Sequence, residues 1–289
     1  DWLVGTGSSW HGAHHLGRGA DAGAGGAGRV IETASSCHDR PTVLAAFAHP
    51  DDEVFRCGGT LALLARRGVR VQTLTATRGG GGSCGDPPLC TRDRLPDVRE
   101  EELRCACRAL GIEAPWLLDY EDGTLSTVDD QEGAAHVLDA IGELRPQVLI
   151  TWPPDGLSGH PDHVAVSRWT RLAFEAADDL GSGAQLALYH MVVPERVGDV
   201  LGFSGLHAVS DEDVTLTVDV APVWEEKLSA IRCHRTQAGE SPILDAPRER
   251  QRLFLGIEHF QQTAAREEDD VLARYLTRSI LNSEEVDDE

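Results

Sequence analysis

Residues 42–64 read TVLAAFAHPDDEVFRCGGTLALL, and this stretch decides the fold. Its first part, Thr42–Ala48, is almost entirely apolar, which is typical of a strand buried on both faces of a parallel sheet. Four polar side chains follow at the carboxyl end of that strand: His49, Asp51, Asp52 and Glu53. Because open α/β sheets bind ligands beyond the carboxyl ends of their strands, the stretch predicts a functional site attached to a buried strand.

Beyond this stretch, predicted strands and helices alternate along the chain. Strands are expected at Val69–Ala76, Trp116–Leu118, Val148–Trp152, Leu186–Val193 and Val214–Val218. Helices are expected at Gly58–Arg67, Pro96–Leu110, 129–144, Val164–Ala177, Pro222–Arg235 and Arg248–Phe260. Strands separated by helices form βαβ units, so the pattern predicts an α/β fold with a mostly parallel sheet.

The length of 289 residues fits one large domain with short appended segments. Residues 1–40 are rich in Gly and Ala and contain few large apolar side chains, so we expect them to be disordered. The folded domain is predicted over residues 41–262. Residues 263–289 are expected to form a helical segment and an acidic tail.

The charge of the chain narrows the classes of partner. It carries 48 acidic residues against 26 basic ones, a formal net charge of −22. Such a balance argues against nucleic acid or an anionic membrane as the main partner. No apolar run reaches the roughly 18 residues of a membrane span, and the first residues do not have the pattern of a signal peptide.

The cysteines suggest a reducing compartment. The chain has 7 of them, an odd number, and none stands in C-x-x-C spacing. We therefore expect reduced thiols in a cytoplasmic enzyme. Cys84 and Cys90 flank a Gly/Pro loop, and their pairing remains open at this stage.

A second cluster of polar side chains follows the strand expected at Val148–Trp152. It reads Gly159-His160-Pro161-Asp162-His163 and opens a helix. His160 and His163 are three residues apart, so both can face the crevice that receives the first cluster.

Together the two clusters have the residue types of a catalytic metal site. His49, Asp52 and His163 would form a three-ligand set that leaves a coordination position open, as catalytic zinc sites do. Asp51 would remain free as a general base, and His160 could donate a proton or stabilise an oxyanion. These parts predict hydrolysis of a carbonyl compound.

Two other functions are considered. A set of two histidines and one carboxylate also suits non-haem Fe(II) oxygenases, but these usually have all-β scaffolds, which the alternation of strands and helices disfavours. A non-catalytic carbohydrate-binding protein is disfavoured because Asp51 is present.

Three further polar residues are expected near the two clusters or at the edge of the pocket. Glu53 is expected to cap or brace the helix that follows it. His234 is expected either at the rim of the pocket or at a helix end, where it would interact with main-chain carbonyls. Arg78 belongs to the glycine-rich loop at residues 77–86, which is expected at the rim of the pocket, and it is a candidate substrate contact.

The motifs Ala48-His-Pro-Asp-Asp-Glu53 and Gly159-His-Pro-Asp-His163 resemble the signature of the PIG-L/LmbE deacetylase family. The resemblance covers roughly residues 40–260. It implies a Rossmann-like fold with helices on both faces of the sheet and a zinc-dependent N-deacetylase that acts on an N-acyl amino sugar or a related amide conjugate. It also implies zinc on His49, Asp52 and His163, with Asp51 as the base and His160 as its electrophilic or acid partner. Further substrate contacts are implied at Arg99 and Asp122.

The chain departs from the mycothiol-type members of that family at two places. Ser158 stands where those enzymes have a tyrosine, and the glycines of Thr77–Ser83 replace an acidic residue. We therefore do not carry their substrate specificity over. The expected partner is a small molecule, and the sequence leaves the oligomeric state open.

Overall fold

The structure is a computed structural model that describes residues 40–177, 186–201, 205–239, 241, 243–265 and 270–277. The disorder expected for residues 1–40 and the acidic tail expected at the other end fall almost entirely outside the described residues. The domain boundaries at 41 and 262 stay predictions.

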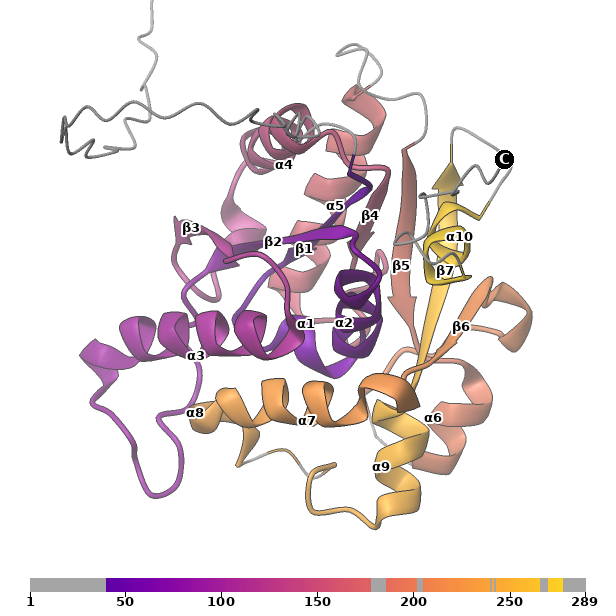
Figure 1. Cartoon of the computed structure of the whole chain (residues 1–289). Helices are drawn as coiled ribbons and strands as arrows, with labels where there is room; N and C mark the ends of the chain where they lie inside the picture. The colour runs from indigo at the N-terminus through magenta and orange to yellow at the C-terminus, as the bar shows by residue number, and fades with distance from the viewer. Residues whose placement is uncertain are drawn as a thin grey trace, which may run out of the picture. The chain divides into compact units, whose positions relative to one another are not determined.

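The described strands form one 7-stranded sheet in the order β3-β2-β1-β4-β5-β7-β6 (Figure 1). Their bounds are β1 Thr42–Phe47, β2 Arg70–Thr77, β3 Trp116–Tyr120, β4 Val148–Thr151, β5 Ala187–Val192, β6 Leu216–Asp219 and β7 Ile257–Ala265. The first five strands pair in parallel, whereas β7 runs antiparallel to both β5 and β6.

Helices cover both faces of this sheet (Figure 1). On one face lie α2 (Gly58–Arg66), α3 (Leu95–Leu110) and α7 (Trp224–Cys233), and on the other lie α4 (Asp130–Leu144) and α5 (Pro161–Ala176). The shorter helices are α1 Asp52–Phe55, α6 Glu195–Leu201, α8 Arg235–Ala238, α9 Arg248–Leu255 and α10 Val271–Thr277, with 3-10 turns at Arg92–Arg94, Leu125–Thr127, Asp211–Asp213 and Ala221–Val223. No helix among the described residues is long and apolar enough to cross a membrane.

The apolar run of β1 serves both cores. Val43, Ala45 and Phe47 point into the core under α2 and α3, whereas Leu44 and Ala46 point into the core under α4 and α5. All five are at most 2% exposed. The parallel strands with helices on both faces confirm the predicted α/β, Rossmann-like fold. They also exclude the all-β scaffold that non-haem Fe(II) oxygenases usually have.

The order of the strands changes direction beside β1. The chain runs from β1 outward to β2 and β3, and then crosses back to β4 on the other side of β1. The loops that follow β1 and β4 therefore diverge, which is where open α/β sheets bind ligands. Both predicted polar clusters lie there, in these two loops and in the first turns of the helices α1 and α5 that follow them.

Two predicted elements were wrong at the C-terminal end. The helix expected at Arg248–Phe260 ends at Leu255, and β7 begins at Ile257 after Gly256. Because β7 continues to Ala265, residues 263–265 of the segment expected to be helical belong to a strand, whereas Val271–Thr277 form the helix α10. The apolar residues of β7 are held by pairing with two distant strands, a contact that local periodicity does not reveal.

The cysteine prediction was also wrong in part. Cys105 of α3 and Cys233 at the end of α7 form a disulfide across 128 residues of sequence. Cys84 and Cys90 do not pair, and they are free together with Cys57 and Cys107. Local spacing could not reveal a bond between residues so far apart. Cysteine usage therefore no longer supports the reducing compartment, and the cytoplasmic location stays a prediction.

Candidate metal centre

Asp52 is fixed by the loop that it follows. Its Oδ2 accepts hydrogen bonds from the main-chain N–H groups of Ala48 (3.0 Å) and His49 (2.9 Å). The carboxylate is thereby turned back over the end of β1. Its other oxygen, Oδ1, lies 3.4 Å from Nε2 of His163.

His163 is held on two sides by the loop after β4. Its Nδ1 lies 3.1 Å from the carbonyl oxygen of Gly156, which places the ring proton on Nδ1. Its ring stacks on Trp152, with centroids 4.0 Å apart and planes inclined by 3°. The Nε2 atom is therefore left to face Asp52.

His49 contacts three carboxylates with its two ring nitrogens. Nε2 lies 3.1 Å from both Asp122 and Asp162, and Nδ1 lies 3.8 Å from Asp52. The side chain of Asp162 has no exposed surface, and it also accepts the main-chain N–H groups of Gly123 (2.7 Å) and Leu125 (3.0 Å). A buried carboxylate thus orients His49, an arrangement common around metal-binding histidines.

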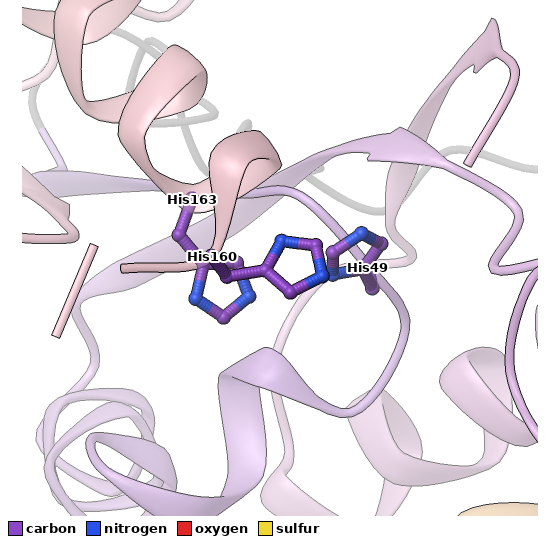
Figure 2. A group of neighbouring side chains, drawn as sticks. All are labelled: His49, His160 and His163. Atoms are coloured by element: carbon purple, nitrogen blue, oxygen red, sulfur yellow. The ribbon is translucent and has the colours of Figure 1, made fainter. Parts of the chain in front are cut away.

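His160 caps the N-terminus of α5. Its Nδ1 accepts the main-chain N–H of Asp162 at 3.2 Å, so the proton of the neutral ring is on Nε2. The ring centroid lies 4.9 Å from that of His49 and 4.7 Å from that of His163, and the three rings gather at one point (Figure 2). Unlike the other two histidines, His160 is exposed.

Two groups of donor atoms within the described residues lie close enough to hold a metal ion. One is His49, His160 and His163, and the other is His49, Asp122 and Asp162, with all donor atoms of a group within 4.8 Å of one another. The predicted set of His49, Asp52 and His163 differs from both. In the predicted set, the atoms that do not hold the side chain in place are Nδ1 of His49, Oδ1 of Asp52 and Nε2 of His163. The corresponding atom of His160, Nε2, carries the ring proton and so has no free lone pair.

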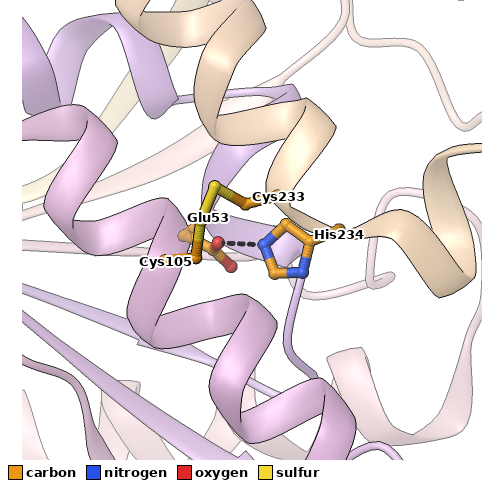
Figure 3. The surroundings of a disulfide bond; sticks show 4 residues. All are labelled: Glu53, Cys105, Cys233 and His234. Carbon is orange, nitrogen blue, oxygen red and sulfur yellow. Dashed lines mark hydrogen bonds and ion pairs between the residues drawn. A yellow bond between two sulfur atoms is a disulfide. The ribbon is translucent and has the colours of Figure 1, made fainter.

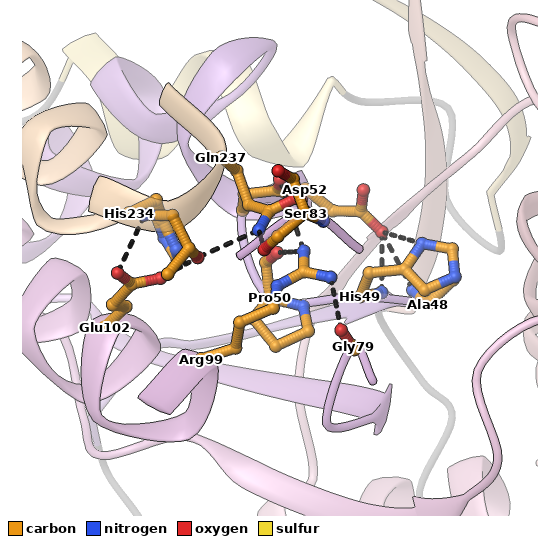
Figure 4. A network of polar contacts seen from close by, with 12 residues as sticks. Ala48, His49, Pro50, Asp52, Gly79, Ser83, Arg99, Glu102, His234 and Gln237 are labelled. Atoms are coloured by element: carbon orange, nitrogen blue, oxygen red, sulfur yellow. Dashed lines mark hydrogen bonds and ion pairs between the residues drawn. The ribbon is translucent and has the colours of Figure 1, made fainter. Parts of the chain in front are cut away.

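Asp51 lies beside these side chains in an unusual backbone conformation. Its φ of 106° is in the left-handed region, which is rare for a residue other than glycine. Arg99 lies next to it. Figure 4 shows that Arg99 reaches Pro50, the residue before Asp51, and Gly79 of the neighbouring loop. The guanidinium of Arg99 donates to the carbonyl oxygens of Pro50 and Gly79 and lies 3.3 Å from Oδ2 of Asp51.

Glu53 and His234 form a buried pair behind Asp51. The side chains of both have no exposed surface, and Nε2 of His234 donates to Oε1 of Glu53 at 2.6 Å. Oε2 of Glu53 accepts the main-chain N–H of Asp51 at 3.0 Å. One of the two positions expected for His234 was the rim of the pocket. Its side chain is enclosed, so it does not lie at such a rim. Glu53 was expected to cap or brace the helix after it, but it lies within α1, and its carboxylate instead bonds to the main chain of Asp51 and to His234.

The other predicted substrate contacts lie at the edge of the site. Arg78 is partly exposed and pairs with Glu100 (2.8 Å) and Asp119 (2.9 Å). Together with Asp122 it lines a cavity of about 380 Å³. Arg99 is buried, so it contacts Asp51 rather than this cavity.

Burial and neighbouring charges shift the pKa values of the site. Burial raises the pKa of Asp51 to about 6, against the lowering effect of Arg99. Burial would also raise the pKa of Asp52, but His163 and His49 outweigh it and lower that pKa. Burial would lower the pKa of His49, but hydrogen bonds to Asp122 and Asp162 raise it to about 10. Although His160 is exposed, the partial loss of solvent around its ring and the two neighbouring histidines lower its pKa.

Three features of the site escaped the sequence analysis. These are the contact of Asp162 with His49, the stacking of Trp152 on His163, and the pairing of Glu53 with His234. For Asp162, only its position inside the second motif could have pointed to such a role. The Glu53–His234 pair joins residues 181 positions apart and left no local signal.

Known proteins resemble this chain in sequence and fold. The profile of a family described as "PIG-L: GlcNAc-PI de-N-acetylase" matches residues 44–174. A protein from Kineococcus radiotolerans named 1D-myo-inositol 2-acetamido-2-deoxy-alpha-D-glucopyranoside deacetylase is 34% identical, over 76% of this chain and 74% of its own. The chain belongs to the PIG-L family.

Solved structures share the fold of this chain. A conserved protein from Thermus thermophilus has a TM-score of 0.58 at 26% identity, covering 77% of this chain and 94% of its own. N,N'-diacetylchitobiose deacetylase from Pyrococcus horikoshii has a TM-score of 0.58 at 20% identity, covering 78% of this chain and 84% of its own. As a PIG-L protein, the chain is an N-deacetylase, a metal-dependent hydrolase of amide bonds.

Proposed function

We propose that this protein is a zinc-dependent deacetylase of N-acetylglucosamine units in small sugar conjugates. One observation carries the proposal: in a PIG-L chain, Asp52 lies beside both His49 and His163, next in sequence to Asp51. The relative from Kineococcus radiotolerans is named as a deacetylase of an inositol-linked acetamido-glucopyranoside, which supports an acetylated glucosamine as the substrate here.

His49, Asp52 and His163 would hold the zinc ion. Their available donor atoms are Nδ1, Oδ1 and Nε2, because the remaining polar atom of each side chain is already bonded to the protein. Two imidazoles and one carboxylate suit zinc and leave a position for water or substrate. The ion, when bound, supplies an activated water and polarises the amide carbonyl.

Asp51 would accept the proton of the attacking water. With a pKa raised to about 6 it is mostly ionised at neutral pH and is still a stronger base than an ordinary aspartate. Its neighbour Arg99 fixes the direction of the carboxylate.

His160 would act as a neutral hydrogen-bond donor. Because its Nδ1 accepts the N–H of Asp162, its proton is on Nε2, and its lowered pKa keeps the ring uncharged at neutral pH. The Nε2–H group can therefore stabilise the negative charge that develops on the carbonyl oxygen. Arg78 and Asp122, which line the adjoining cavity, would contact hydroxyl groups of the sugar.

The test is release of acetate and a free amine by the zinc-loaded protein. N-acetylglucosamine, its inositol glycoside and N,N'-diacetylchitobiose form the substrate panel, and Asp51→Asn is the inactive control. We expect turnover of at least one conjugate, and the ranking within the panel identifies the group attached to the sugar. A protein that holds zinc but releases amine from none of them would contradict the proposal.

A further inference from the structure

Asp51 needs support to keep its conformation. A non-glycine residue in the left-handed region carries backbone strain, and this conformation persists only where surrounding contacts determine it. The main-chain N–H of Asp51 donates one such contact, a 3.0 Å hydrogen bond to Oε2 of Glu53. The orientation of the Glu53 carboxylate therefore bears directly on the placement of Asp51.

The Glu53 carboxylate is itself held by a residue from a distant part of the chain. With no exposed surface, it depends on hydrogen bonds within the protein, since an unpaired buried charge is strongly unfavourable. Nε2 of His234 donates such a hydrogen bond to the other carboxylate oxygen, Oε1, at 2.6 Å. The main-chain N–H of Asp51, the Glu53 carboxylate and the His234 ring thus form one continuous chain of hydrogen bonds.

His234 is anchored on both sides in sequence. The residue before it, Cys233, is bonded to Cys105 of α3 (Figure 3). Two residues after it, Thr236 donates to the carboxylate of Glu102 through its main-chain N–H (2.9 Å) and its hydroxyl (2.6 Å). The segment that carries His234 is thus fastened to α3 at two points, and the ring has a fixed position from which to hold Glu53.

We infer that His234 is a positioning residue for the catalytic base, acting through Glu53 on the main chain of Asp51. It lies too deep to touch the substrate. Its effect is to keep Asp51 where its carboxylate can reach the attacking water. The inference rests on the proposed role of Asp51 as the base.

Two substitutions at one position separate this role from a general contribution to folding. His234→Gln places an amide nitrogen near the position of Nε2 and retains the hydrogen bond to Glu53, whereas His234→Leu removes it. We expect His234→Leu to lower kcat by about tenfold or more, with KM and zinc content within about twofold of the wild type. We expect His234→Gln to retain kcat within about threefold.

A matched control comes from another buried histidine. His190 is 2% exposed, and its ring nitrogens have no hydrogen-bond partner among the described residues. His190→Leu therefore removes a buried imidazole without touching the chain of hydrogen bonds to Asp51. This variant should leave kcat unchanged.

A double-mutant cycle with Asp51→Asn supplies the decisive comparison. If His234 acts through the base, His234→Leu should reduce kcat in the wild type but by less than about twofold in Asp51→Asn. Equal losses in both backgrounds would overturn the inference, and so would a His234→Gln variant as impaired as His234→Leu. Should His234→Leu fail to fold, His234→Asn takes its place, because its shorter amide cannot reach Glu53.

Hydrogen exchange at the Asp51 amide distinguishes a failure of this inference from a failure of the proposed function. If the wild type hydrolyses no substrate, the proposed function falls. Faster exchange in His234→Leu than in His234→Gln or His190→Leu would still support the brace, by which we mean the hydrogen bonds from His234 through Glu53 to the Asp51 amide. Exchange at that amide equal in all three variants would overturn the brace, whatever the activity.

Discussion

At the scale of single residues, the site divides the polar atoms of each side chain between two tasks. Nε2 of His49, Nδ1 of His163 and Oδ2 of Asp52 bond to the protein, and the opposite atom of each remains available. The protein-bonded atoms set ring orientation and tautomer, which determines which atom a metal ion meets. A candidate metal ligand is therefore identified here by two features: the position of its side chain, and the protein group that is bonded to the atom turned away from the metal.

The histidines should therefore differ in their effect on metal content. His163→Ala removes a proposed ligand, so we expect the purified variant to lose most of its zinc, whereas His160→Ala should retain about the wild-type content. Elemental analysis of both variants measures this directly. Loss of zinc from His160→Ala and retention in His163→Ala would instead require a different ligand set.

Replacement of Asp51, the proposed base, should separate chemistry from metal binding. Asp51→Asn preserves the shape of the side chain but cannot accept a proton, so kcat should fall by about a hundredfold or more while zinc content stays level. Steady-state kinetics on metal-loaded protein provide the measurement. Near-normal kcat in this variant would transfer the role of base to another group.

At the scale of elements, the sequence was most informative where apolar runs end in polar clusters. The strand at Thr42–Ala48 and its counterpart at Val148–Trp152 were predicted with boundaries close to the observed ones, because burial on both faces leaves a clear apolar run. Elements whose identity depends on distant partners were not predicted correctly. The start of β7, for example, was predicted as helix. For the same reason, the disulfide between α3 and α7 and the enclosure of His234 could not be predicted.

The link between α3 and α7 should matter for stability. A disulfide between residues separated by 128 positions restricts the unfolded chain, so Cys105→Ser with Cys233→Ser should lower the free energy of unfolding by about 2–5 kcal/mol. Urea denaturation of the double variant and the oxidised wild type gives this difference. Cys84→Ser with Cys90→Ser is the matched control, because those two cysteines are free, and it should change stability by less than about 1 kcal/mol. Equal stability of the three proteins would contradict the prediction.

At the scale of the whole molecule, buried histidines away from the site make folding sensitive to acid. Both ring nitrogens of His190, on β5, lack a hydrogen-bond partner among the described residues. Burial lowers its pKa to about 4, and burial likewise lowers the pKa of His259, on β7, to about 4. Both rings are therefore neutral in the folded protein at pH values where they would be protonated in the unfolded chain.

The sign of the pH dependence follows from these pKa values. Between about pH 6.5 and pH 4 the unfolded chain binds more protons at these histidines than the folded protein does, so the free energy of unfolding should fall as the pH is lowered. His190→Leu should reduce the slope in this window by up to about 1.4 kcal/mol per pH unit. Denaturation curves at several pH values test it, and an unchanged slope would show that His190 does not contribute.

The brace formed by His234 also affects when the site is completed during synthesis. Every side chain proposed to bind zinc or to move a proton lies between His49 and His163, whereas His234 and its anchor Cys233 come from the end of α7. Because a ribosome delivers the chain from its N-terminus, the ligands emerge well before the brace does. A partly made chain would therefore carry the proposed metal ligands without a properly held Asp51, and full activity would be reached only after α7 has docked on α3.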